Sequence, residues 1–249
     1  MAKSEDIAWK RLTAEAIAIV VSILLAFWID AWWEQRLETK SAIEHLQAFE
    51  VELVDNGERL DASIREVNSG LRNLIAAMTK LADPEIEHLP ESIQSDIGAA
   101  LWFQGNANVM SAYYELVNSN SYSSLQNSDL IKSIGDYGLL IESLGRMNDY
   151  QGESYLAVVL PALSQHLALS NLGWTKYDDA FDQSDENSHN DLQTQFLAND
   201  NELRSREFLN ALYHWKTVQI DIRDALTMLQ EDVAILRPLL HAEIEDLTR

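Results

Sequence analysis

Two Glu-x-x-His pairs are the closest approach to a catalytic motif in this sequence. Glu85 stands three residues before His88, and Glu186 stands three residues before His189. In helical bundles, two such pairs together with two further glutamates bind a pair of iron ions. Both pairs here lie in polar stretches rather than on an apolar helix face, so a fortuitous surface match is the favoured interpretation. We predict no metal centre and no cofactor.

A run of acidic residues within 171–192 has the carboxylate groups that Ca²⁺ prefers as ligands. The run lacks the spacing and the glycine of an EF-hand loop. We therefore predict a solvated acidic loop with little order. Its acidic side chains include Asp178, Asp179, Asp182, Asp185 and Glu186.

Motifs for nucleophilic catalysis and nucleotide binding are absent from the sequence. There is no cysteine, and the histidines His45, His166, His214 and His241 have no serine motif beside them. No G-x-S-x-G, H-E-x-x-H, P-loop or dinucleotide glycine pattern occurs. These absences favour a protein that is not an enzyme. A metal-dependent helical-bundle enzyme is the least favoured alternative.

The longest apolar stretch predicts a membrane span. Between Ala16 and Ile29, Ser22 is the only polar side chain. Residues 12–33 supply the roughly 20 residues that a hydrocarbon core of about 30 Å requires. Indole rings are apolar with one polar N–H group, which favours the headgroup layers on either side of that core. The expected interface anchors are Trp9, Trp28, Trp32 and Trp33.

A cleaved signal peptide is the alternative for this stretch, because residues 1–11 form a basic segment. No A-x-A-like site follows and tryptophans crowd the place where cleavage would fall, so we predict that the span is retained. Only Arg36 and Lys40 follow it closely, against three basic residues before it. The positive-inside rule then favours a cytoplasmic N-terminus. We expect a single-pass protein of the bacterial inner membrane with its helical domain in the periplasm.

Small residues at a spacing of four predict a partner for the span. Rows of this kind let two helix backbones approach closely, and packing drives helix association in lipid. The alternative is that alanine is simply common in spans. The predicted packing row is Ala14, Ala18, Ser22 and Ala26, and the same spacing continues through an acidic exit of Asp30, Glu34 and Glu38.

Asp30 is the acid closest to the apolar stretch on its far side. Asp30 and Glu34 are like charges one helical turn apart, and their repulsion grows where water is scarce. Arg36 or Lys40 of a neighbouring chain, a bound cation, or protonation of Asp30 would offset it. An acid wetted by headgroup water is the favoured interpretation. An ion-coupled or sensor-like membrane component that uses Asp30 is the alternative function.

Heptad repeats predict an all-α fold in which the span continues into an antiparallel bundle of long helices. Apolar residues recur every seven positions in residues 34–82 and again in 201–247. We expect both helices to bury these seams inside one soluble domain, residues 34–249. The seams are Leu46, Leu53, Leu60, Val67, Leu74 and Leu81, and Phe208, Trp215, Ile222, Leu229 and Leu236.

Shorter helices are expected between the long ones. Asp83 and Pro84 should end the first long helix, residues 118–128 should form a polar turn, and Pro238 should kink or restart the last helix. The expected short helices are Pro90 to about Phe103, residues 109–118, Asn127 or Ser128 to Asn148, and residues 152–170 with a kink at Pro161.

Negative charge is concentrated beyond the span. Residues 1–40 carry five basic and six acidic side chains, a net charge of −1, so residues 41–249 carry −21 of the total of −22. A domain with this charge repels nucleic acid and anionic lipid. We predict no nucleic-acid partner. The expected partners are the lipid bilayer and another transmembrane helix, from a second copy or from a different membrane protein.

Two segments resemble a group of uncharacterised single-span bacterial membrane proteins. They are LLAFWIDAWWEQRLE at the end of the span and AYYELVNSNSYSSLQNSDLIKSIGDY in the middle of the chain. The resemblance implies an anchored, helical, bacterial protein and carries over no activity, cofactor or catalytic residue. The unbroken helical pattern at the bilayer edge and the row of small residues favour a non-enzymatic interaction, scaffold or accessory protein that forms oligomers. Burial of the heptad seams inside the chain is favoured over an intermolecular coiled coil.

Overall fold

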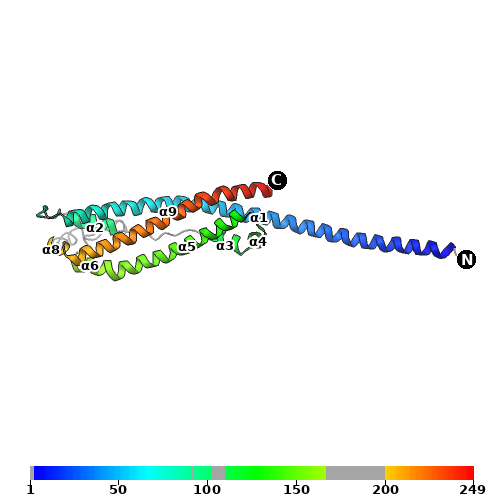
Figure 1. Cartoon of the computed structure of the whole chain (residues 1–249), viewed down its shortest axis with the longest axis horizontal. Helices are drawn as coiled ribbons and strands as arrows, with labels where there is room; N and C mark the ends of the chain where they lie inside the picture. The colour runs from blue at the N-terminus through cyan, green and yellow to red at the C-terminus, as the bar shows by residue number, and fades with distance from the viewer. Residues whose placement is uncertain (1–2, 91, 102–109, 167–199) are drawn as a thin grey trace, which may run out of the picture. The chain divides into compact units, whose positions relative to one another are not determined.

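The computed structural model of the chain describes residues 3–90, 92–101, 110–166 and 200–249, which contain helices and no strand (Figure 1). The predicted all-α class is confirmed. The helices are α1 (Lys3–Ala82), α2 (Ile93–Leu101), α3 (Ser111–Asn118), α4 (Asn120–Ser124), α5 (Ser128–Ser154), the π-helical turn η1 (Tyr155–Val159), α6 (Leu160–His166), α8 (Asp200–Leu203) and α9 (Arg206–Thr248).

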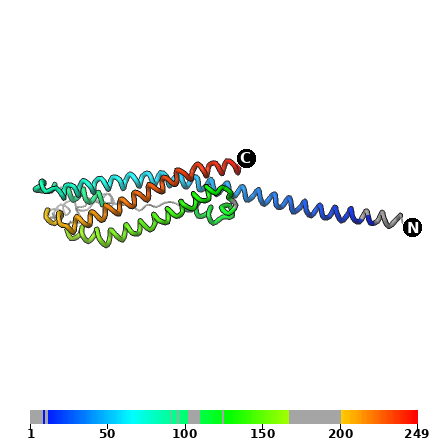
Figure 2. Tube along the Cα trace, in the orientation of Figure 1, coloured from blue at the N-terminus to red at the C-terminus, as the bar shows by residue number. Residues whose placement is uncertain are grey.

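Helix α1 runs without a break from the apolar stretch to Ala82, as the sequence predicted. Figure 2 shows its Cα trace as one continuous coil. The predicted end at Asp83 and Pro84 is also confirmed. There the Asp83 carboxylate accepts a hydrogen bond from the Glu85 amide at 2.9 Å, and this local turn replaces the next helical turn.

Helix α9 departs from the predicted helix over residues 201–247 at its start. The short helix α8 ends at Leu203, and α9 begins at Arg206. Ser205 caps α9, because its hydroxyl accepts a hydrogen bond from the Phe208 amide at 3.2 Å. Pro238 does not restart the helix, which continues through it to Thr248. Leu236 and Leu240 are fully buried on either side, and this packing holds the helix together where the proline lacks a donor.

The shorter helices correct several predicted boundaries. Helix α2 begins at Ile93 rather than at Pro90, whose carbonyl accepts a bond from the Ile93 amide at 2.9 Å. The predicted polar turn at 118–128 contains a helix, α4. Asn127 caps α5 as expected, accepting a hydrogen bond from the Leu130 amide at 3.2 Å. Residues 102–109 and the predicted acidic loop at 171–192 lie outside the described residues.

A break was predicted between Asn148 and Gly152, and this prediction was wrong. Helix α5 continues to Ser154, and the irregularity comes later, in η1. There the Leu160 amide donates to the Tyr155 carbonyl, five residues back instead of four. Pro161 explains the wide turn, because its ring would clash with the carbonyl of Ala157 in a regular helix.

The chain divides into two compact units, which share helices α1, α5 and α9. The first, called the collar unit here, comprises Met1–Glu52, Met110–Ile131 and Leu239–Arg249. The second, called the bundle unit, comprises Leu53–Val109 and Lys132–Pro238. The predicted boundary between span and soluble domain at residues 33 and 34 lies inside α1 and inside the collar unit.

In the bundle unit, α1 and α9 are antiparallel. Gly57 faces Val233, and four residues further along α1 the Asp61 carboxylate accepts a hydrogen bond from Gln230. The predicted seams are buried here, with Leu60, Leu74 and Leu81 on α1 and Phe208, Trp215, Ile222, Leu229 and Leu236 on α9 all at most 2% exposed. Val67 is only half-buried. Figure 1 shows α5 as the third long helix. At one end, α2, α6 and α8 close the core.

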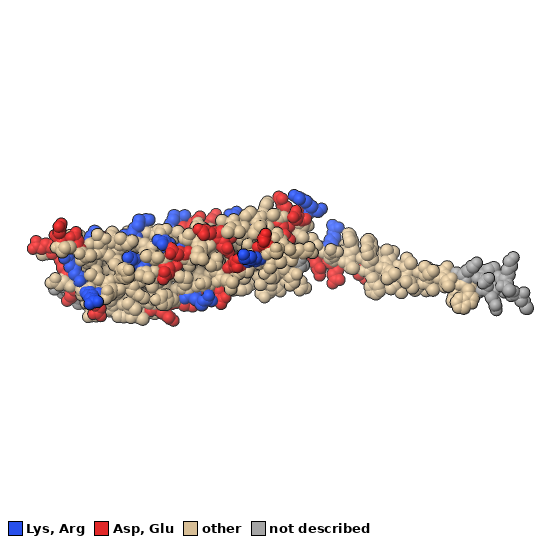
Figure 3. Space-filling view, in the orientation of Figure 1, with Lys and Arg blue, Asp and Glu red and all other residues tan. Residues whose placement is uncertain are grey.

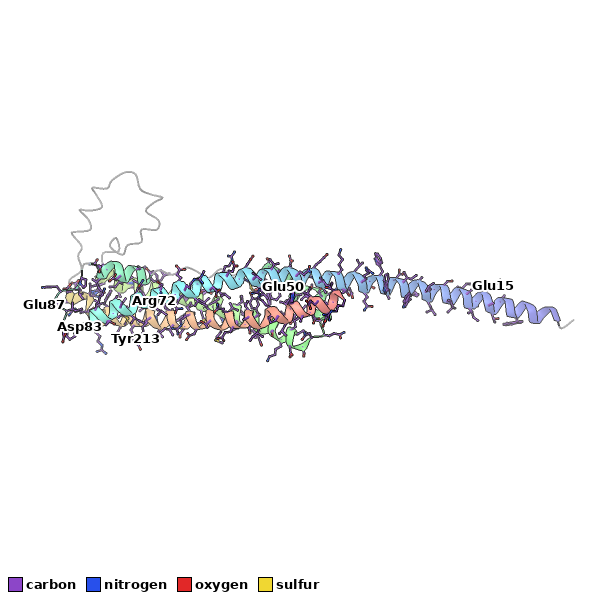
Figure 4. The ribbon with its side chains drawn as sticks, turned by 90° about the horizontal axis from the view of Figure 1, so that it is seen from above. Glu15, Glu50, Arg72, Asp83, Glu87 and Tyr213 are labelled. Atoms are coloured by element: carbon purple, nitrogen blue, oxygen red, sulfur yellow. The ribbon has the colours of Figure 1, made fainter. Side chains whose placement is uncertain are left out.

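In the collar unit, the last turns of α9 lie beside α1. His241 Nδ1 is 3.2 Å from the carboxylate of Glu50, which Figure 4 labels on α1 next to α9. Leu46 and Phe49 of α1 are fully buried, as is Leu240 of α9. The seams predicted from the heptads therefore also supply the core of this unit.

Candidate membrane anchor and membrane-proximal groove

The apolar stretch of α1 is covered by no described part of the chain. Every large apolar side chain from Leu12 to Trp33 is 48–67% exposed. Figure 3 shows a tan surface along this stretch and acidic side chains gathered near its end. Among the described residues, α1 is the one helix long and apolar enough to cross a membrane. Burying these side chains in lipid would remove a large apolar area from water.

The predicted interface tryptophans lie exposed on α1. Trp9 is 70% exposed and Trp28 is 66% exposed. Trp32 and Trp33 contact each other with ring centroids 6.4 Å apart, and the Arg36 guanidinium lies 5.6 Å from the Trp32 ring centroid. This cation–π contact places a charge and an indole together, a combination suited to a headgroup layer.

The predicted packing row and acidic exit form a winding stripe on α1. A spacing of four turns about 40° further round an α-helix at each step, so the drift from Ala14 to Asp30 is about 160°. All members of the row, and Asp30, Glu34 and Glu38, are exposed. The structure therefore leaves both the small residues and the acids accessible and brings no second helix to them among the described residues.

The hydroxyl group of Ser22 forms a hydrogen bond within α1. Its Oγ donates to the Ala18 carbonyl at 2.8 Å, one turn back along α1. Thr13 makes the same bond to the Trp9 carbonyl at 2.9 Å. A hydroxyl bonded in this way does not need a partner from another helix when it faces lipid.

The two cations that follow the span have partners in their own chain. Arg36 stacks on Trp32 as described, and Lys40 Nζ lies 3.6 Å from the Glu44 carboxylate, one turn further along α1. Both contacts are exposed and hold these side chains only weakly. Within the described part of the chain, neither cation forms an ion pair with Asp30.

Glu52 anchors α3 to the collar part of α1. Its side chain is only 6% exposed, and its carboxylate accepts hydrogen bonds from the Ala112 amide at 2.7 Å, the Tyr113 amide at 3.1 Å and the Ser111 hydroxyl at 3.2 Å. Helix α3 has no cap of its own, because Met110 precedes it. A carboxylate from α1 therefore binds the positive end of the α3 dipole.

Two further contacts hold α3 and α4 on the same side of α1. The Phe49 ring packs against Tyr113 with centroids 5.8 Å apart, and His45 Nδ1 lies 3.1 Å from the Ser121 hydroxyl. His45, Phe49 and Glu52 follow one another at helical spacing on one face. Burial raises the pKa of Tyr113, and the nearby phenol groups of Tyr122 and Tyr114 add to the rise.

A groove opens between α1 and the α3–α4 turn in the collar unit. Its volume is about 380 Å³. Sequence reasoning missed it, because its two walls are some 80 residues apart along the chain. The one available signal was that the first turn of α3 contains neither a capping side chain nor an acid. The groove is lined by Leu37, Glu38, Ser41 and His45 from α1 and by Ser119, Asn120 and Ser121.

The bundle unit contains a buried polar contact between α1 and α5. Asn56 Nδ2 donates to the Tyr137 hydroxyl at 3.1 Å, and both residues are fully buried. Nearby on α9, one carboxylate oxygen of Asp232 is buried without a hydrogen-bond partner among the described residues. Burial raises the pKa of Asp232, and the negative charge of Asp136 raises it further.

A second groove, of about 460 Å³, lies between α9 and the η1–α6 segment of the bundle unit. Its floor is made of small residues and its polar groups are two amides, a carboxylate and an imidazole. These groups can form hydrogen bonds, and the described lining residues include no Ser, Thr, Cys or Lys. The polar groups belong to Gln165, Glu207, Asn210 and His214.

The metal-site motifs find no support in the described residues. These residues contain no cluster of three or more His, Cys, Asp or Glu side chains able to hold a metal ion. His88 lies 3.8 Å from Asp200, and its side chain is 89% exposed. The pair Glu186 and His189 and the five acids proposed for Ca²⁺ lie outside the described residues.

No family model, curated protein or solved structure matches this chain. The resemblance to uncharacterised single-span membrane proteins therefore stays a prediction, and the functional argument rests on the chain's own residues.

Proposed function

We propose that the chain is a non-enzymatic, membrane-anchored interaction protein, a scaffold or accessory subunit held in the bilayer by residues 12–33. In this proposal the span crosses a bacterial inner membrane with its N-terminus in the cytoplasm. The helical collar and bundle units then lie in the periplasm. The partner is another transmembrane helix, supplied by a second copy of the chain or by a different membrane protein.

The observation that carries the proposal is the continuity of α1. One unbroken helix contains both the exposed apolar stretch and the buried core positions Leu46, Leu60 and Leu74. Because helices transmit position and rotation better than loops do, contacts made in the membrane would be passed directly to the folded units. This arrangement suits a scaffold and needs no catalytic group.

Insertion is tested by extracting native membranes with alkaline carbonate. Lysine at the centre of a span costs about 2.5–3.5 kcal/mol on insertion scales. The double change Ile19→Lys and Leu24→Lys should therefore shift the protein from the membrane to the soluble fraction. Leu37→Lys is the matched control, since Leu37 is a similarly exposed apolar residue beyond the span. A wild-type chain that is extracted as readily as the double variant would overturn the proposal.

The partner helix is tested by photo-crosslinking from inside the membrane. A crosslinker at Ala18 or Ala26 should capture a specific protein, because these positions belong to the small row. A crosslinker at Leu24, about 160° round the helix from Ser22, should capture mainly lipid. Equal capture from both sides, or none from the row, would argue against a partner at that face.

Orientation can be tested cleanly because the sequence contains no cysteine. Single cysteines at Ser4 and at Thr248 would be labelled with a membrane-impermeant maleimide in intact cells and again after lysis. We expect the cysteine at 248 to be labelled in cells with a permeable outer membrane and the cysteine at 4 only after lysis. The reverse pattern would place the helical units in the cytoplasm.

A further inference from the structure

The membrane-proximal groove has the chemistry of a site for a small zwitterion. It offers the Ser41 hydroxyl, the Asn120 amide and one carboxylate, that of Glu38. The Ser119 hydroxyl already donates to the Leu116 carbonyl at 2.6 Å, and the Ser121 hydroxyl is paired with His45. Hydroxyls and amides can donate to phosphate oxygens, while a carboxylate accepts from an ammonium group. No lysine or arginine is among the described residues that line the groove, so an anionic ligand would meet Glu38 without a compensating cation from these residues.

The position of the groove along α1 indicates where such a ligand would come from. Leu37 and Glu38 follow Trp33 by four and five residues, which is about 6–8 Å along a helix. The headgroup layer of a bilayer is roughly 5–8 Å thick on each side of the hydrocarbon core. The mouth of the groove then lies at the height of the lipid headgroups. Leu37, which is 53% exposed, lies at the end nearest the hydrocarbon.

The walls of the groove are held in place independently of any ligand. The Glu52 carboxylate fixes the start of α3, the Phe49–Tyr113 contact fixes its middle, and the His45–Ser121 contact fixes α4. Ser121 is only 6% exposed. A preformed site loses little conformational freedom on binding, which favours affinity for a small headgroup.

We infer that this groove binds the phosphoethanolamine headgroup of a membrane lipid, with the ammonium on Glu38 and the phosphate on the Ser41 hydroxyl and the Asn120 amide. Ethanolamine fits better than choline, because a quaternary ammonium has no N–H to donate and is usually held by aromatic rings. Among the described residues, no Phe, Tyr or Trp side chain lines this groove. The inference rests on the proposed membrane span, since only an inserted chain holds the groove at headgroup height.

The test uses the full chain in nanodiscs made of phosphatidylcholine with equal minor amounts of phosphatidylethanolamine and phosphatidylglycerol. Lipids that stay bound after mild release are counted by native mass spectrometry. We expect phosphatidylethanolamine to be enriched over its share in the disc. Glu38→Gln should reduce this enrichment by about tenfold, the effect of losing one charge-assisted hydrogen bond. Glu34→Gln, an exposed acid one turn earlier and outside the groove, should leave it unchanged.

The outcomes separate failure of the headgroup site from failure of the anchor. Carbonate extraction of the same variants reports insertion, so a chain that inserts but retains the three lipids in proportion to their shares overturns the headgroup site alone. Preference for phosphatidylglycerol, or an equal loss in Glu34→Gln, also overturns it. Soluble glycerophosphoethanolamine added in the same amount should not compete. If it displaces the lipid, the source of the ligand is a free headgroup and the inference is wrong.

Discussion

Among single residues, Glu52 has the clearest structural task, because three donors at the start of α3 converge on one buried carboxylate. Removing it leaves those donors unsatisfied. We expect Glu52→Ala to destabilise the attachment of α3 by about 1–3 kcal/mol. Hydrogen exchange should show faster exchange at the Ala112 and Tyr113 amides. Glu58→Ala, at an exposed position on the same helix, should leave these amides as protected as before.

Asp232 lowers the stability of the folded state at neutral pH, whereas Glu52 raises it. Burial and Asp136 raise the pKa of Asp232 above that of the unfolded chain. The folded state therefore binds its proton more tightly. Stability is lost as the pH rises through the pKa that Asp232 has in the unfolded chain and then through its higher pKa in the folded state. The stability is regained on acidification.

We therefore expect Asp232→Asn to stabilise the bundle unit at pH 7, by less than about 1 kcal/mol because the group is partly solvated. The gain should vanish as the pH falls towards 4. Chemical denaturation followed by circular dichroism at several pH values measures it. Asp221→Asn, an exposed acid on the same helix, is the control. A gain that is the same at pH 4 and pH 7 would show that the charge of Asp232 is not its cause.

At the scale of elements, the Asn56–Tyr137 hydrogen bond joins α1 to α5, and both side chains are fully buried. Tyr137→Phe removes the hydroxyl that accepts from Asn56 while keeping the ring. We expect a loss of about 1–2 kcal/mol in the free energy of unfolding. Tyr213→Phe is matched chemically, but the Tyr213 side chain is 58% exposed on α9 and should cost almost nothing. Equal effects of the two changes would contradict a role for the buried hydrogen bond.

The long helices were predictable from the sequence, and their connections were not. Leu60 and Trp215 recur at heptad spacing because each must face the interior, so periodicity alone located the seams. Gly152 looked like a break, yet α5 runs through it because neighbouring Gln151 and Ser154 are buried against the bundle. A single glycine is a weak signal for the end of a helix where tertiary packing favours the helix.

Of the candidate site, only the exposed apolar stretch of α1 could be predicted from the sequence. Its apolar composition and flanking tryptophans are local features of residues 9–33. The groove depends instead on Glu52 reaching the start of α3 and on His45 reaching Ser121, 76 residues away. Contacts between residues so far apart along the chain produce no periodic pattern in a single sequence. The missing cap before Ser111 was the only local hint of them.

At the scale of the whole molecule, the span and the folded units draw on separate sets of residues. The large apolar side chains between Leu12 and Trp33 are at least 48% exposed, so no described part of the chain covers them. The first buried residue of α1 among those described is Ala42. The folded units should then owe their stability to residues beyond the span.

A chain that begins at residue 34 should therefore fold without a membrane. It keeps Leu46, Phe49 and the Glu52 cap, and its negative charge favours solubility. We expect its free energy of unfolding to lie within about 1 kcal/mol of that of the full chain in detergent, since only exposed residues are lost. A chain that begins at residue 54 loses all three groups and should leave the α3 amides unprotected from hydrogen exchange. If the first truncation aggregates or unfolds as the second does, the apolar stretch contributes to the stability of the fold.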